Sequence, residues 1–158
     1  MAPPVKPAII AAGAVAVAAA AGSAAADPRS DWYQSLRKPS WQPPPAAFPL
    51  VWAPLYASIA VAGARALSRA GSQTRGPVIR NLLTDLALNA AWPPLFFRVR
   101  RPRAALAEIA GLNLANAALI RRAWQADRTA ALLLVPYAAW TVFATALNTE
   151  IVLLNPGS

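Results

Sequence analysis

Long apolar stretches separated by short polar segments make up most of the sequence. Each stretch has about 17 to 26 residues, close to the roughly 20 with which a helix crosses the hydrocarbon core of a bilayer. The pattern predicts an all-α integral membrane bundle of five transmembrane helices, in a single domain over residues 1–158. The expected spans are 8–26, 48–67, 80–97, 104–120 and 129–154, with a structured loop over 27–47.

The first stretch has a second interpretation, as a secretory signal peptide. Lys6 precedes it, and Ala24 to Ala26 offer a small-residue cleavage site. However, a single lysine is a weakly basic start for a signal peptide, and the rest of the chain is equally membrane-like. We therefore expect a span that packs inside the bundle through its small residues.

Prolines and tryptophans concentrate in the loop between the first two spans. Trp32 and Trp41 lie there, with prolines at positions 39, 43, 44 and 45. Proline fixes its own φ and moves the preceding residue out of the α region, so residues 36–45 are not expected to be helical. A stiff loop with aromatic side chains suits a lid over a site, or an anchor at the membrane surface.

The composition agrees with a membrane protein. The chain is 57% hydrophobic and 13% charged, about half the charged fraction of water-soluble domains. Cysteine and histidine are both absent, which excludes disulfides, thiol nucleophiles, histidine acid–base catalysis and most zinc or haem ligation. We expect no metal site and no resident cofactor.

The net charge of +9 comes mostly from arginines, in short clusters between the apolar stretches. Nucleic-acid-binding surfaces instead place basic and aromatic residues together on a polar face. Arginines that flank membrane spans explain the charge better, so we expect membrane lipid rather than nucleic acid as a partner.

Three of the predicted spans carry aromatic and polar side chains at a helical spacing of three or four residues. If these stripes face one another, they line a pocket for a large, flat, mostly apolar ligand. The alternative is ordinary helix packing, with Asn89 and Asn148 as hydrogen-bonded bridges worth about 0.6 kcal/mol each. The stripes are Phe48, Trp52 and Tyr56; Asp85, Asn89, Trp92 and Phe96; and Tyr137, Trp140, Thr141, Ala144 and Asn148.

Two acidic residues, Asp85 and Glu108, lie inside predicted spans, where an unpaired charge is costly. Such residues are functional candidates by default. For Glu108, a salt bridge with Arg101 or Arg103 is favoured over a role in proton relay, and for Asp85, Arg80 and Asn89 are the available partners. The residues alone do not indicate a catalytic centre, because they include no metal-ligand cluster, no nucleophile–base pair with His or Cys, and no convincing pair of carboxylates.

Three segments resemble the TspO/translocator-protein family, which includes the tryptophan-rich sensory proteins and the peripheral benzodiazepine receptor. The similarity covers nearly the whole chain, in order and at family spacing. Trp32-Tyr33, Leu36, Lys38-Pro39-Ser40-Trp41-Gln42-Pro43-Pro44, Phe48, Val51-Trp52 and Leu55-Tyr56 resemble its first loop and second helix; LALNAAWPPLFF at 86–97 resembles its third helix; VPYAAW at 135–140 and ATALN at 144–148 resemble its fifth.

The resemblance implies a five-helix membrane bundle, often a homodimer, with a pocket open toward the first loop. It implies ligands such as porphyrins, isoquinoline or benzodiazepine-type drugs and, in some members, sterols. It also implies light-dependent breakdown of protoporphyrin IX, which several members promote and which is attributed to positions matching Trp52 and Trp140. Asn89 and Ala144 match ligand-lining positions, and Trp32 and Trp41 match the lid.

The sequence departs from the family pattern at three places. Ser40 stands where some bacterial members carry another tryptophan, and Asp85 stands where a neutral glutamine is frequent. After Asn148 the chain reads TEIVLL, without the tyrosine and basic residue of the proposed cholesterol motif, so tight sterol binding there is not expected.

The sequence supports a membrane-embedded binding protein, sensor or transporter for tetrapyrroles. The pocket residues would be Trp32, Trp41, Phe48, Trp52, Tyr56, Asn89, Trp92, Tyr137, Trp140, Ala144 and Asn148. One alternative is a light- and oxygen-dependent porphyrin-degrading enzyme with Trp52 and Trp140 as catalytic residues, and a second is a sterol or lipid translocator. Alanine- and arginine-rich usage favours a multi-pass protein of a bacterial cell envelope.

Overall fold

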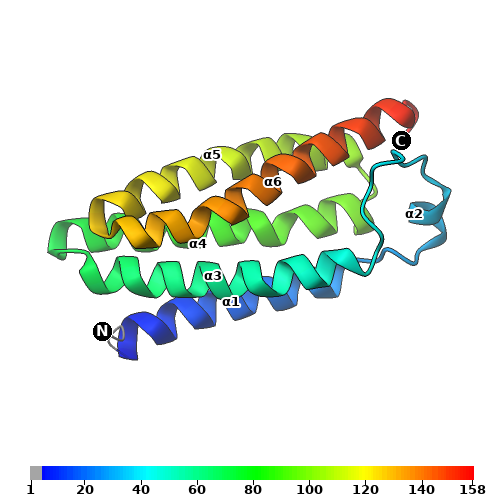
Figure 1. Cartoon of the computed structure of the whole chain (residues 1–158). Helices are drawn as coiled ribbons and strands as arrows, with labels where there is room; N and C mark the ends of the chain where they lie inside the picture. The colour runs from blue at the N-terminus through cyan, green and yellow to red at the C-terminus, as the bar shows by residue number, and fades with distance from the viewer. Residues whose placement is uncertain (1–4) are drawn as a thin grey trace.

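Residues 5–158 fold into five long helices, one short helix and a π-helical turn (Figure 1). The computed structural model describes residues 5–158, and no strand occurs among them. In chain order the elements are α1 (Val5–Ala25), α2 (Asp31–Ser35), α3 (Ala47–Arg69), α4 (Ser72–Pro93), the π-helical segment η1 (Pro94–Arg98), α5 (Pro102–Ala126) and α6 (Arg128–Leu154).

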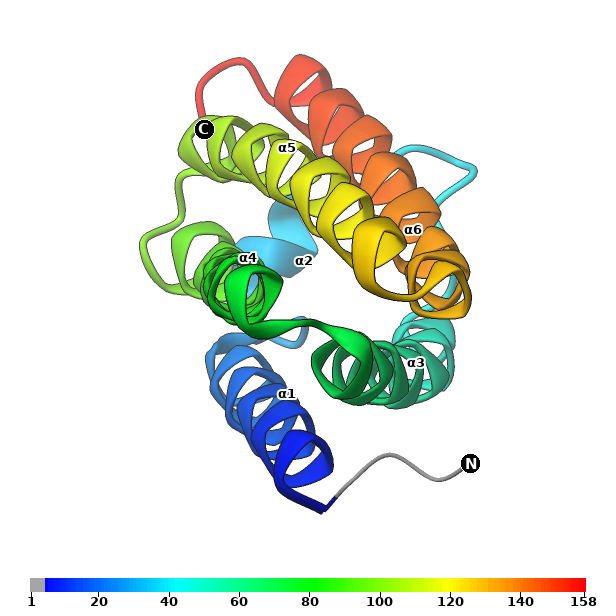
Figure 2. The same ribbon diagram turned by 90° about the vertical axis from the view of Figure 1, so that its left-hand side faces the viewer.

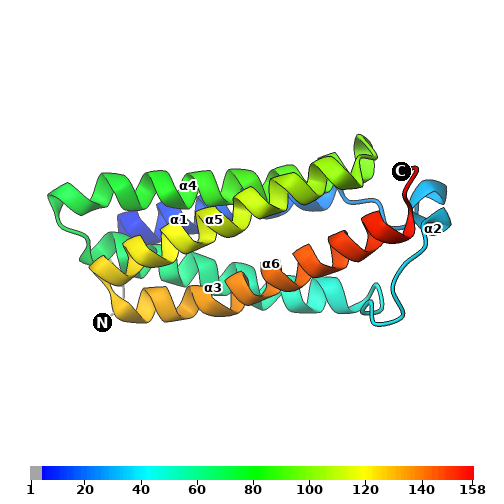
Figure 3. The same ribbon diagram turned by 90° about the horizontal axis from the view of Figure 1, so that it is seen from above.

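The long helices pack side by side in an elongated bundle. Around it they follow one another in the order α1, α3, α6, α5 and α4, and α4 closes the ring against α1 (Figure 2). The segment that contains α2 covers one end of the bundle, beside the C-terminus, and α1 begins at the opposite end (Figures 1 and 3). We call these the lid end and the distal end.

Many large apolar side chains face outward from the bundle, and on α1 mostly small ones face inward. On α1, Val5 and Val17 are 72% and 70% exposed, whereas Ala11 is fully buried and Gly22 is buried. Three helices, α1, α3 and α6, are long and apolar enough to cross a membrane. Both features point to a membrane protein. The two remaining long helices, α4 and α5, have 22 and 25 residues but carry more charged side chains.

The largest differences from the predicted helix boundaries are at α4 and α5. The expected spans left residues 68–79 as a connection, but α4 already begins at Ser72 and includes Gly76 and Pro77. The connection is short because the Gly71 carbonyl accepts the backbone N–H groups of Thr74 and Arg75, which starts the helix at once. Pro77 lies in the second turn of α4, so its missing N–H removes one backbone hydrogen bond there, and the helix continues through it. α5 also continues past residue 120, to Ala126.

The double proline at the end of α4 changes the helix type. Pro93 and Pro94 lack the N–H groups that would bond the carbonyls four residues earlier. The following turn is wider, and the Val99 N–H donates to the Pro94 carbonyl, five residues back, at 2.9 Å. The chain then reverses at Arg100, whose φ of 58° is in the left-handed region. The wide turn directs Phe96 into the interior, where it is 1% exposed.

The α5–α6 connection is held to α3 by an ion pair. Asp127 caps α6 by accepting the Ala130 N–H at 2.7 Å, and its carboxylate lies 3.0 Å from the Arg65 guanidinium. Burial alone would raise the pKa of Asp127, but the Ala130 N–H and Arg65 outweigh it, so the pKa lies below its ordinary value.

Candidate functional site

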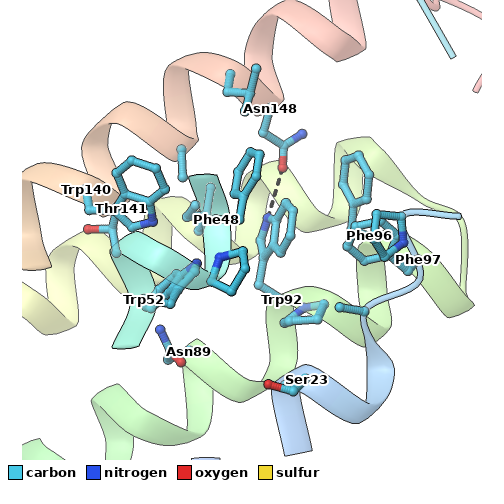
Figure 4. Close-up of a pocket in the computed structure, with 18 of the residues that line it drawn as sticks. Ser23, Phe48, Trp52, Asn89, Trp92, Phe96, Phe97, Trp140, Thr141 and Asn148 are labelled. Carbon is cyan, nitrogen blue, oxygen red and sulfur yellow. Dashed lines mark hydrogen bonds between the residues drawn. The ribbon is translucent and has the colours of Figure 1, made fainter. Parts of the chain in front are cut away.

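A cavity of about 410 Å³ lies at the lid end, enclosed by the long helices, η1 and the α1–α3 segment. Its volume is within the range of small-molecule sites, which are mostly apolar clefts of about 300–1,000 Å³. Figure 4 shows side chains from several helices converging on it. The aromatic residues of its wall are Tyr33, Phe48, Trp52, Tyr56, Trp92, Phe96, Phe97 and Trp140.

Aromatic rings of α3 and α6 form one wall of the cavity. Trp52 stacks on Tyr56, one helical turn further along α3, with ring centroids 5.1 Å apart. Trp140 of α6 meets Trp52 nearly at a right angle, with centroids 6.5 Å apart, and meets Phe48 edge to face at 6.0 Å. These edge-to-face and stacked geometries are the favoured ones for aromatic pairs. The wall is therefore a set of rings that hold one another in place.

The facing wall comes from α4 and η1. Trp92 stacks on Phe96 with centroids 4.8 Å apart. Its indole N–H donates to the Asn148 side-chain oxygen at 3.0 Å, the dashed line in Figure 4. The Asn148 amide in turn donates to the Pro102 carbonyl at 3.0 Å. Asn148 thus fixes the Trp92 ring and bridges α4, α5 and α6.

A hydrogen-bond chain leads from the cavity wall into the bundle. The Tyr56 hydroxyl donates to the Asn89 side-chain oxygen, and the Asn89 amide donates to the Tyr137 hydroxyl, each at 3.1 Å. Tyr137 donates to Asp85 at 2.9 Å. Asp85 is fully buried, and its second oxygen has no partner among the described residues. Neither Arg80 nor Asn89, the two available partners, bonds to Asp85 in the described structure, where Tyr137 takes that place.

The prediction of a salt bridge at Glu108 is wrong. Neither of its carboxylate oxygens has a partner among the described residues. Arg103, one of the two expected partners, donates instead to the Pro156 carbonyl at 2.8 Å. Arg103 lies in the first turn of α5, and its side chain binds the backbone after the end of α6 rather than Glu108 on its own helix.

The α1–α3 segment closes the lid end through local hydrogen bonds. Ser30 caps α2 by accepting the Tyr33 N–H, and Gln42 donates to the Tyr33 hydroxyl at 3.1 Å. Asn155, after α6, binds the backbone of Arg37 from both sides, accepting its N–H at 2.9 Å and donating to its carbonyl at 2.8 Å. Burial raises the pKa of the Tyr33 hydroxyl, an effect that the Gln42 hydrogen bond partly offsets. The short helix α2 was not predicted, although Ser30 is a good N-cap residue.

Comparison with known proteins identifies the family. A model of the TspO/MBR family matches residues 8–154, which is nearly the whole chain and includes most of α1.

The chain belongs to the TspO/MBR family.

Named relatives agree with this assignment. The chain is 38% identical over 125 residues to a tryptophan-rich sensory protein of Cereibacter sphaeroides, a match that covers 79% of this chain and 77% of the relative. It is 33% identical over 144 residues to the protein CrtK of Rhodobacter capsulatus, covering 90% of both. It is 40% identical over 119 residues to the human translocator protein, covering 74% of this chain and 70% of the relative.

Most of the binding residues expected from the TspO/MBR resemblance line the single cavity described above. These are Phe48, Trp52, Tyr56, Asn89, Trp92, Trp140, Ala144 and Asn148. Three of the expected residues do not lie on its wall. Trp32 packs edge-on against Phe96 at 5.7 Å, Trp41 is 48% exposed and packs against Phe143, and Tyr137 is fully buried behind Asn89.

Other wall residues were not among those predicted. Ile109 and Leu112 of α5 line the cavity, as do Ser23 and Ala26 near the end of α1. Aliphatic and small residues in an apolar helix carry no sequence signal that separates a cavity wall from ordinary packing. Tyr33 and Gln42 could have been found, since both lie within the family-like motif of the first loop.

Nothing among residues 5–158 brings three acidic side chains together as a metal site would require. What the cavity offers is flat apolar surface with a small number of hydrogen-bonding groups.

Proposed function

We propose that this TspO/MBR protein is a membrane-embedded binding protein for flat, hydrophobic ligands of the tetrapyrrole class, and acts as a sensor or transporter for them. The observation that carries the proposal is the cavity wall of eight aromatic side chains, held in place by their mutual contacts. Flat aromatic ligands gain most from such a wall, because both dispersion and offset stacking scale with the ring area in contact.

Unused hydrogen-bond donors at the centre of the wall support this chemistry. The indole N–H groups of Trp52 and Trp140 have no acceptor among the described residues, whereas that of Trp92 is engaged by Asn148. Two free donors in an apolar cavity favour a ligand that carries acceptor atoms on an otherwise apolar body.

The same proposal includes five membrane spans rather than three. α4 and α5 are long enough to cross a bilayer, and each is packed between neighbours in the ring. Several of their polar side chains, including Asp85, Asn89 and Asn116, are buried in the bundle. Polar residues with that orientation are compatible with a span, because they do not face lipid.

Filling the cavity tests the binding proposal. Ala144 lies on the wall, and Ala146 of the same helix is exposed on its outer side. Ala144→Phe should weaken protoporphyrin IX binding by tenfold or more, on the order of 1.4 kcal/mol, while Ala146→Phe should leave it unchanged. The measurement is tryptophan-fluorescence quenching of the purified protein in detergent, in the dark. If wild-type protein shows no saturable quenching, the proposal is wrong.

A second candidate function is light- and oxygen-dependent degradation of the bound porphyrin. It is favoured by the contact of the Trp52 and Trp140 rings on the cavity wall, beside any ligand. Under light, Trp52→Phe should abolish the change in porphyrin absorbance while leaving dark binding nearly intact. Trp124→Phe, on the outer side of α5 and 48% exposed, is the matched control. Equal loss of binding and degradation in Trp52→Phe would count against a chemical role for this residue.

A further inference from the structure

The polar groups deep in the cavity are largely engaged with one another. Asn89 bonds to Tyr56 and Tyr137, and Asn148 bonds to Trp92 and Pro102. The Thr141 hydroxyl accepts from Asn116 and donates to the Ala138 carbonyl. Apart from the two indole N–H groups of Trp52 and Trp140, which suit single neutral acceptor atoms, the deep wall offers no free donor for a carboxylate among the described residues, so a charged substituent of a ligand is expected to remain near the rim.

At the rim, a guanidinium lies beside residues of the wall. Arg98 follows Phe97, which lines the cavity, and donates to the Ala24 carbonyl at 3.0 Å. Ala24 itself lies in the chain between Ser23 and Ala26, both of which line the cavity. This hydrogen bond fixes the Arg98 side chain across the gap between η1 and the end of α1.

Most hydrogen-bond donors of the Arg98 guanidinium are free in the described structure. Only one of its five N–H donors is engaged in the described structure, and no acidic side chain lies within ion-pair distance of it. The Ser23 hydroxyl, on the adjacent wall, likewise has no hydrogen bond to a described residue (Figure 4). Asp27 and Asp31 are the acidic residues of the neighbouring α1–α3 segment, and neither forms an ion pair that would neutralise Arg98.

We propose that Arg98, whose guanidinium is held at Ala24, the chain neighbour of the wall residue Ser23, forms an anion-recognition subsite at the rim of the cavity, and that it binds a carboxylate of the ligand. The inference rests on the proposed function and narrows its ligand class to flat aromatic acids, whose apolar body enters the aromatic cavity while a carboxylate stays at the rim. A guanidinium suits this role because its fork of donors matches the two oxygens of a carboxylate.

The test compares protoporphyrin IX, which has two carboxylates, with its dimethyl ester, which has none. Binding of each is titrated in a non-ionic detergent, so that no anionic lipid headgroup competes for Arg98. Wild-type protein should prefer the diacid by about tenfold, the size of one partly exposed charge-assisted hydrogen bond. Arg98→Gln should remove this preference by weakening diacid binding alone, and Arg98→Lys, which keeps the charge without the fork, should be intermediate.

Arg101→Gln is the matched control, because it removes an equal charge from an exposed position in the same basic loop. It should leave the preference for the diacid unchanged. If Arg98→Gln weakens diacid and ester equally, or if Arg101→Gln acts like Arg98→Gln, a specific subsite at Arg98 is excluded. Equal wild-type binding of both porphyrins would overturn this inference and leave the proposed function standing, whereas binding of neither would overturn both.

Discussion

The two ends of the bundle use the same helices but pack them in different ways. At the distal end, α1, α3 and α4 approach closely through small residues. Gly63 lies against Ala11 and Leu82, and a Cβ atom added to it would come within 3.1 Å of both. At the lid end, stacked and edge-to-face rings such as Trp52 and Trp92 occupy the space between helices and leave a cavity.

The difference shows how one membrane bundle can be both stable and open. Lipid provides no hydrophobic driving force for helix association, so close packing of small residues and interhelical hydrogen bonds must hold the helices together. The distal end supplies the close packing. The lid end replaces part of it with hydrogen bonds, among them those of Asn148 and Asn89, which keep the aromatic walls in position around an unfilled space.

The largest expected effect comes from breaking the close packing. Gly63→Leu should destabilise the protein by about 3 kcal/mol, since a large side chain cannot fit without moving α1 or α4. Thermal unfolding in detergent measures this. Gly111→Leu is the control, because a Cβ atom at Gly111 has no neighbour within 4 Å. Equal stability of the two variants would show that the distal end is not closely packed.

A smaller effect is expected from removing the bridge at the lid end. Asn148→Ala leaves the Trp92 indole N–H without its acceptor, which should cost about 2 kcal/mol of stability and loosen the ring that lines the cavity. Porphyrin affinity should therefore fall together with the melting temperature. Asn81→Ala is the control, since Asn81 bonds only to the Pro77 carbonyl of its own helix. Unchanged ligand affinity in Asn148→Ala would mean that the bridge does not shape the cavity.

The smallest effect concerns the distal ion pair between Arg65 and Asp127. Because the folded protein holds the pKa of Asp127 below its ordinary value of about 3.9, the pair stabilises the fold above that pH, and the contribution is lost as pH falls through the lowered pKa. Arg65→Gln should lower stability at pH 7 by at most about 1 kcal/mol. The difference in melting temperature between wild type and variant should narrow toward pH 3. A difference that is independent of pH would exclude the ion pair as its cause.

The helices could be predicted well from the sequence, but their ends less so. The lengths of the apolar stretches identified five helical segments, yet the third was expected to begin at residue 80, whereas α4 begins at Ser72 and includes Gly76 and Pro77. Glycine and proline lower the stability of a helix, and for that reason they often mark its ends. Here α4 nevertheless contains both of them in its second turn. The π-helical turn after Pro94 was not predicted either, since it depends on how the chain must return to begin α5.

For the candidate site, too, some features could be predicted from the sequence and others could not. Spacing along single helices correctly grouped Trp52 with Tyr56 and Asn89 with Trp92, because residues three or four apart share a face. It could not place Tyr137, which has the spacing of the α6 wall but turns into the core to bond Asp85. Nor could it predict that Arg98 reaches the Ala24 carbonyl, a contact between residues 74 positions apart.

The sequence by itself determined that this chain is helical, apolar and a member of the TspO/MBR family, because composition, periodicity and motifs are local properties of the chain. Only the tertiary structure decided which aromatic rings face the cavity, which carboxyl group is buried behind it, and which arginine is held at the end of α1. Those outcomes depend on how far apart the helices are held, and that distance is set by small residues at one end of the bundle and aromatic rings at the other.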